Sequence, residues 1–137
     1  MAILEHPGVF ELVVPDGWVA RQFDDGTYAL EPSAGDGVVN ISVYSKTLSH
    51  VPTAAEMLRS FVRSVTGTVP ATEAIKTVSG TGQERAFVRF EHDGHQWFAG
   101  FMVFPRAGVL ATFNAPRERG EHVAAGVQLV AGIAPLP

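Results

Sequence analysis

Apolar positions in this chain recur with two periods, one of two residues and one of three to four. The shorter period is typical of β-strands and the longer one of amphipathic helices. Runs with strand character lie at 9–14, 27–31, 38–45, 71–78, 85–91, 97–104 and 109–113. Helical stretches interrupt them after residue 52 and after residue 115. The pattern therefore predicts strands, a helix, more strands and a closing helix.

The pair Asp93-Gly94 gives the sharpest local prediction. It separates two β-rich runs, and both residues tolerate the positive φ that the centre of a type I′ turn requires. The turn predicts the pairs His92–His95, Phe90–Trp97, Val88–Ala99 and Ala86–Phe101 on one face, and Glu91–Gln96, Arg89–Phe98 and Phe87–Gly100 on the other. A second reversal at 105–108 is expected to return 109–113 beside 100–104.

The run 97–104 is apolar on both faces of the predicted sheet. A strand with one face in water would alternate, so both faces are expected to be covered at this strand. The neighbouring run 85–91 differs, because Arg85, Arg89 and Glu91 share one of its faces. That face is expected to be only partly covered.

The first helix is predicted to begin at Thr53, which forms a capping-box pattern with Glu56. Gly67 suits its C-terminal end. Its apolar side is formed by Met57, Leu58, Phe61, Val62 and Val65. Pro116 is placed at the first position of the second helix, which is expected to extend over 117–132.

These elements predict an α+β fold, a single antiparallel sheet of about six to seven strands flanked by two helices. The 137 residues suit one domain, 1–137.

The net charge of −4 and the scattered basic residues argue against a nucleic-acid partner. No apolar run approaches the ~20 residues of a membrane span. No signal peptide is recognisable, so a cytoplasmic location is expected. Arginine outnumbers lysine eight to two, which favours a GC-rich bacterial source.

The stretch Phe10–Trp18, FELVVPDGW, resembles the F-x-hydrophobic-x-hydrophobic-P-x-G-W opening of the PsbP-like superfamily. That superfamily includes the PsbP extrinsic protein of photosystem II, a Ran-binding nuclear import factor, bacterial lipoproteins and Eag-type chaperones of secreted effectors. The order of predicted elements is similar to theirs over nearly the whole chain. The resemblance implies an antiparallel sheet between helices. It also implies protein binding, without catalytic residues common to the superfamily.

Candidate chemistry is sparse. His92 and His95 flank the predicted turn on one face and are weak metal candidates, since a site needs a third and usually a fourth ligand. The chain has no cysteine, and no cofactor motif or nucleophile–base pair is recognisable. No cofactor and no enzymatic activity are therefore expected.

The leading interpretation is a non-catalytic protein-binding, adaptor or chaperone-like domain, with another protein or itself as partner. Phe87, Arg89 and Phe98 are the candidate partner-binding residues, on a partly exposed sheet face. One alternative is a small-molecule-binding or hydrolytic domain with a cleft between sheet and helix, near which His92, His95 or Asn114 would be expected. Another is a structural homo-oligomer.

Overall fold

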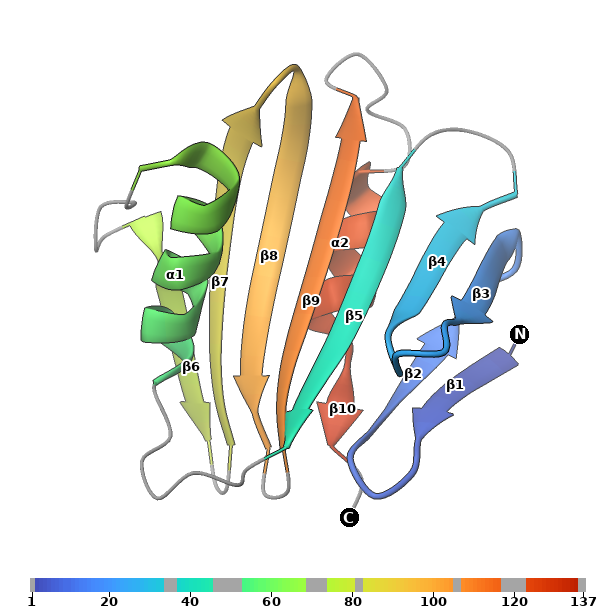
Figure 1. The fold of residues 1–137 in the computed structure, drawn as a ribbon. Coiled ribbons are helices and arrows are strands. Elements are labelled where there is room, and N and C mark those ends of the chain that lie inside the picture. Colours follow the sequence, from blue (N-terminus) through green and yellow to red (C-terminus); the bar gives the residue numbers. More distant parts are fainter. Residues whose placement is uncertain are drawn as a thin grey trace.

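The structure is a computed structural model that describes residues 2–33, 37–45, 53–68, 74–80, 83–104, 107–116 and 123–135. Its elements, shown in Figure 1, are β1 (Ala2–His6), β2 (Phe10–Val14), β3 (Trp18–Gln22), β4 (Tyr28–Pro32), β5 (Val38–Ser45), α1 (Ala54–Thr66), β6 (Lys76–Gly80), β7 (Gln83–His92), β8 (His95–Val103), β9 (Ala107–Pro116), α2 (Val123–Ala131) and β10 (Ala134–Pro135).

Seven strands form one antiparallel sheet in the order β3-β4-β5-β9-β8-β7-β6. Helix α1 packs on β7 and β8, on what we call the α1 face of this sheet. Helix α2 packs on β5, β8 and β9 on the opposite side, the α2 face (Figure 1). The expected α+β fold with two flanking helices is confirmed, and β3 and β6 form the two edges of the large sheet.

The central hairpin has the predicted register. Asp93 and Gly94 have φ of +51° and +76°, the positive values that a type I′ turn requires. His92 lies opposite His95, and every other pair predicted between β7 and β8 is found. The register of a two-residue hairpin follows from its turn, which is why sequence alone determined it.

The next hairpin differs from the prediction by two residues. Val109 lies opposite Met102, whereas the prediction placed it opposite Phe104. The backbone N–H of Phe104 donates to the carbonyl oxygen of Ala107 at 2.9 Å, so β9 begins at Ala107. The reversal is tighter than the four-residue turn expected at 105–108. Because the shift is an even number of residues, the same side chains still face the core.

Helix α1 has both predicted caps. The Thr53 hydroxyl accepts a hydrogen bond of 3.2 Å from the backbone N–H of Glu56. At the other end Gly67, with φ of +79°, donates its N–H to the Arg63 carbonyl at 2.8 Å. A third contact comes from the sheet, where the Glu84 carboxylate of β7 accepts from the Ala54 N–H at 2.9 Å. The start of the helix is therefore held to the strand on which it packs.

At the second helix the structure differs from the prediction at Pro116. Pro116 is the last residue of β9, opposite His95, and α2 begins at Val123. Proline is tolerated at the end of a strand because its missing N–H breaks no further pair. Residues 117–122, where the helix was expected to start, lie outside the described residues.

The chain also contains a second, smaller sheet, which the sequence did not predict. Its strand order is β1-β2-β10. Strand β2 corresponds to the predicted strand 9–14, but β1 and the two-residue β10 were missed. Strand β6 is displaced as well. It extends over 76–80, two residues beyond the end of the predicted strand 71–78, while 71–73 lie outside the described residues.

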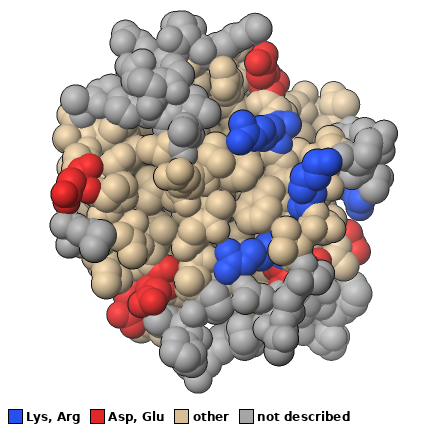
Figure 2. All heavy atoms as spheres, turned by 180° about the vertical axis from the view of Figure 1, so that it is seen from behind, with Lys and Arg blue, Asp and Glu red and all other residues tan. Residues whose placement is uncertain are grey.

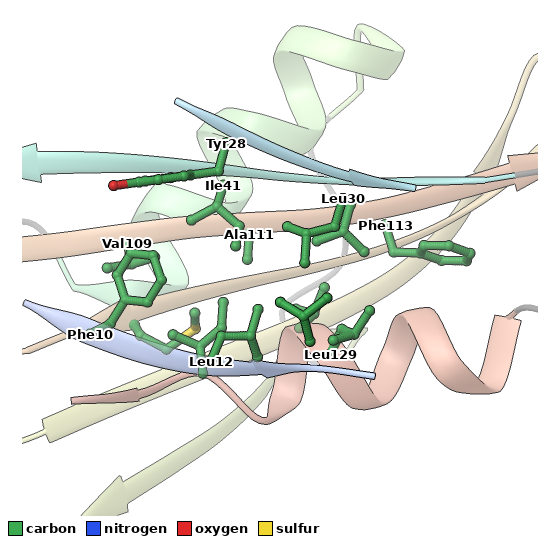
Figure 3. Close-up of a cluster of buried hydrophobic side chains, with 14 of the residues drawn as sticks. Phe10, Leu12, Tyr28, Leu30, Ile41, Val109, Ala111, Phe113 and Leu129 are labelled. Atoms are coloured by element: carbon green, nitrogen blue, oxygen red, sulfur yellow. The ribbon is translucent and has the colours of Figure 1, made fainter. Parts of the chain in front are cut away.

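Two apolar clusters lie on opposite faces of the large sheet. On the α2 face the larger cluster joins β2, the strands of the large sheet and α2, and Figure 3 shows Phe10, Leu12 and Leu129 meeting Leu30, Ile41 and Phe113 there. On the α1 face a smaller cluster joins Leu58 and Val62 of α1 to Val88 and Phe101. Strand β8 contributes to both, as its apolar sequence predicted.

Candidate interaction surface

Alternation along β7 places Arg85, Phe87, Arg89 and Glu91 on the α2 face of the sheet, beyond the strands that α2 covers. The register adds Phe98 of β8, opposite Arg89, and two residues of the edge strand β6. We call this surface the basic–aromatic face, and its residues are Lys76, Val78, Arg85, Phe87, Arg89 and Phe98. All three residues predicted to bind a partner therefore lie on one surface.

Phe87 and Phe98 form the apolar floor of the face. Their rings are stacked, with centroids 5.6 Å apart and planes 5° from parallel. Gly100 makes this possible, because a Cβ there would lie 2.9 Å from the Phe87 ring. Both phenylalanines remain only partly buried. Aromatic surface of this kind is left in water at a cost unless something covers it.

Arg89 is exposed, and its guanidinium carbon lies 5.4 Å from the centroid of the Phe98 ring. Such cation–π contacts contribute about 0.5–1 kcal/mol at exposed sites. They leave the N–H groups of the guanidinium available at the ring's edge. No described residue forms an ion pair with Arg89 or with the exposed Lys76.

Arg85 has a structural role. Its Nη1 donates to the Ala131 carbonyl at 3.3 Å, at the C-terminal end of α2, where a cation is favoured by the helix dipole. The guanidinium also lies 5.5 Å from the buried Phe104 ring. Burial lowers the pKa of Arg85 from its ordinary value, but a guanidinium stays charged at neutral pH. Arg85 thus joins α2 to β7.

Two clefts meet at Arg89 and Phe98. One, of about 360 Å³, is lined by Ala74, Lys76, Phe87, Val88, Arg89 and Phe98. The other, of about 280 Å³, extends toward Val127 in the middle of α2 and includes Glu91 and Gln96. Figure 2, which views this side of the molecule, shows basic side chains gathered on one part of the surface around uncharged residues. The two clefts adjoin at Arg89 and Phe98, and we call them together the groove of the basic–aromatic face.

The histidine hairpin does not form a metal site among the described residues. His92 and His95 lie opposite each other as predicted, but Asp93 engages both. Its Oδ2 lies 3.2 Å from His92 Nε2, and its carbonyl oxygen lies 3.2 Å from His95 Nδ1. The described residues contain no group of three potential ligands.

One histidine contact was missed by the sequence analysis. His6 Nδ1 lies 2.7 Å from the Tyr28 hydroxyl, and the His6 ring stacks on Phe10. The pair joins β1 of the small sheet to β4 of the large sheet, beside a cleft of about 430 Å³ that includes Asp25 and Tyr44. Hydrogen bonds from Thr27 lower the pKa of Asp25. No signal in the sequence relates His6 to Tyr28, because the docking of two sheets sets their contact.

The four clefts described here are not lined by His92, His95 or Asn114, the residues expected near a ligand site. The fourth cleft, of about 460 Å³, lies between α2 and the turn before Trp18, and its lining is mainly apolar. Neither described helix is long and apolar enough to cross a membrane.

Similarity to known proteins is visible in the fold alone. No protein-family model and no curated protein sequence matches the chain. The solution structure of cyanobacterial PsbP from Synechocystis is similar, with a TM-score of 0.61 and 13% identity over 93% of this chain and 86% of that one. The chain has a PsbP-like fold. The expectation drawn from the opening motif is confirmed at this level.

A second structure, of a protein from Bacteroides thetaiotaomicron, resembles this PsbP-like chain with a TM-score of 0.54 and 15% identity. The match covers 93% of this chain and 45% of that one, so the present chain spans less than half of the Bacteroides protein. At such identities the shared feature is the architecture, and residues of a functional site are not transferred.

Proposed function

We propose that this PsbP-like chain is a non-catalytic protein-binding domain of the adaptor or chaperone type, and that its partner docks on the basic–aromatic face. The observation that carries the proposal is the exposed Arg89 guanidinium over a half-buried Phe98–Phe87 stack. Arginine and aromatic residues are the types enriched at the centre of protein interfaces. The stacked rings of Phe87 and Phe98, with Arg89 beside them, are residues of these types.

The experiment is affinity capture of the tagged protein from lysate of its own host, read by mass spectrometry, beside an Arg89→Glu variant. Arg63→Glu is the matched control, because Arg63 is an exposed arginine on α1, on the opposite face. We expect a stoichiometric partner that wild type and Arg63→Glu retain and Arg89→Glu loses. A partner retained equally by all three would contradict docking on this face.

A homo-oligomer is the second candidate, and one observation favours it. Ile3 of β1 and Val13 of β2 lie opposite each other, and their side chains are 65% and 50% exposed. β1 is also an edge of the small sheet. Exposed apolar residues beside a strand edge are a common two-fold contact. Light scattering of wild type and of Ile3→Lys separates this candidate from a monomer.

A further inference from the structure

We infer that the occupant of the basic–aromatic face is an acidic peptide segment with an aromatic or large aliphatic anchor. The inference rests on the proposed function and names the chemistry of the partner. It follows from the charges of the face, from its floor and from the extent of its groove.

The charges come first. Strands β6, β7 and β8 place Lys76, Arg85 and Arg89 on this face, and their one carboxylate on the same side is Glu91. Glu84, the other carboxylate of β7, points to the α1 face, where it binds α1. Among the described residues this part of the surface is therefore cationic, in a chain whose net charge is −4. Complementary charge steers an anionic partner to it and disfavours a cationic one.

The floor adds a second requirement. Between the exposed cations Lys76 and Arg89 the cleft of about 360 Å³ has the partly buried rings of Phe87 and Phe98 at its base. A carboxylate alone would leave those rings in water. An aromatic or large aliphatic side chain packed on the rings would bury them. Carboxylates beside that side chain would form ion pairs with the two cations.

The extent of the groove distinguishes a peptide from a small aromatic acid, which carries the same two groups. The clefts of about 360 Å³ and 280 Å³ share Arg89 and Phe98, so the groove extends from the edge strand β6 to the middle of α2 at Val127. A small acid fills one cleft. A peptide places its anchor in one cleft and its neighbouring residues along the other.

The direct test uses random twelve-residue peptides displayed on phage and selected in parallel on wild type, Arg89→Glu, Lys76→Glu and Arg63→Glu. We expect wild type and Arg63→Glu to enrich sequences with Asp or Glu next to Phe, Trp or Leu. Both charge-reversal variants on the face should lose these sequences. A labelled synthetic copy should bind wild type at least tenfold more tightly than either variant, with affinity falling as salt rises.

Other results overturn the inference in separable ways. Enriched peptides that depend on Arg89 but are neutral or basic would contradict the acidic occupant and leave the proposed function standing. Peptides that bind all four proteins equally would contradict both. Displacement of the labelled peptide by 3-phenylpropionate at similar concentrations would point to a small acid instead. A dimer of wild type that Arg89→Glu abolishes would identify a second copy of this chain as the occupant.

Discussion

A Cβ atom on Gly126 of α2 would lie 2.3 Å from the ring of Phe113 on β9. Helix α2 therefore approaches the sheet more closely at this point than any other residue would permit. Phe113 is buried in the larger apolar cluster, and its ring occupies the space that a side chain at 126 would need. This contact fixes the distance between α2 and the large sheet, and with it the boundary of the basic–aromatic face.

Gly126→Ala is predicted to lower the free energy of unfolding by about 1–2 kcal/mol. The added methyl group would lie 2.3 Å from a buried ring, so its overpacking cost is placed in the upper part of the usual range, at about 2–3 kcal/mol, while the better helix propensity of alanine returns ~1 kcal/mol. Urea denaturation measures the difference. Gln128→Ala, at an exposed position of the same helix, serves as control and should change the value by less than ~0.5 kcal/mol. An unchanged or raised stability of Gly126→Ala would show that α2 lies farther from the sheet.

Glu84→Ala is predicted to destabilise the chain by about 1–2 kcal/mol, because the Ala54 N–H at the start of α1 loses its acceptor. Glu84→Gln should cost less, since an amide oxygen still accepts the hydrogen bond but no longer complements the helix dipole. Thermal unfolding followed by circular dichroism ranks the variants. Equal effects of the two substitutions would mean that the side chain does not bind the helix.

Arg89→Glu is predicted to change the free energy of unfolding by less than ~1 kcal/mol, because the residue is exposed and the change removes one cation–π contact. Phe98→Ala should cost more, since it removes a ring packed against the core. Partner binding should fall in both variants. A large loss of stability in Arg89→Glu would assign this arginine a structural role and remove it from the interaction surface.

Tyr28 predicts a pH dependence. Burial raises the pKa of its phenol above the ordinary value of 10.0. The folded chain thus favours the protonated phenol, so this contribution to stability is fully present below pH 10 and is lost as the pH rises from 10 through the raised pKa of the folded chain. Tyr28→Phe should cost about 1 kcal/mol at pH 7 through the lost contact with His6. The gap between wild type and variant should narrow in urea titrations from pH 7 to 10.5. A constant gap would contradict this account of Tyr28.

The sequence correctly predicted those elements whose geometry is determined by a turn or by a helix cap. Asp93-Gly94 set the register of β7 and β8, and Thr53 and Gly67 marked the ends of α1. The three candidate contact residues could be placed on one face for the same reason. Lys76 was missed because its position depends on the pairing of β6 with β7, which no local pattern indicated.

Contacts between distant segments were not predictable in this way. The sequence around Gly126 does not indicate that this residue lets α2 approach Phe113 closely. The small sheet was missed because β1 is largely exposed and β10 has two residues, so neither shows a strong alternation. Both features depend on how helices and strands that are distant in the sequence pack against one another.

Site-specific photo-cross-linking tests whether a partner docks on the basic–aromatic face. Benzoylphenylalanine replaces either Val78, which is 57% exposed on that face, or Val19, which is 53% exposed on the opposite face of the sheet. After irradiation in host lysate, we expect a discrete adduct from position 78 and none from position 19. An adduct from position 19 alone, or from neither position, would contradict it.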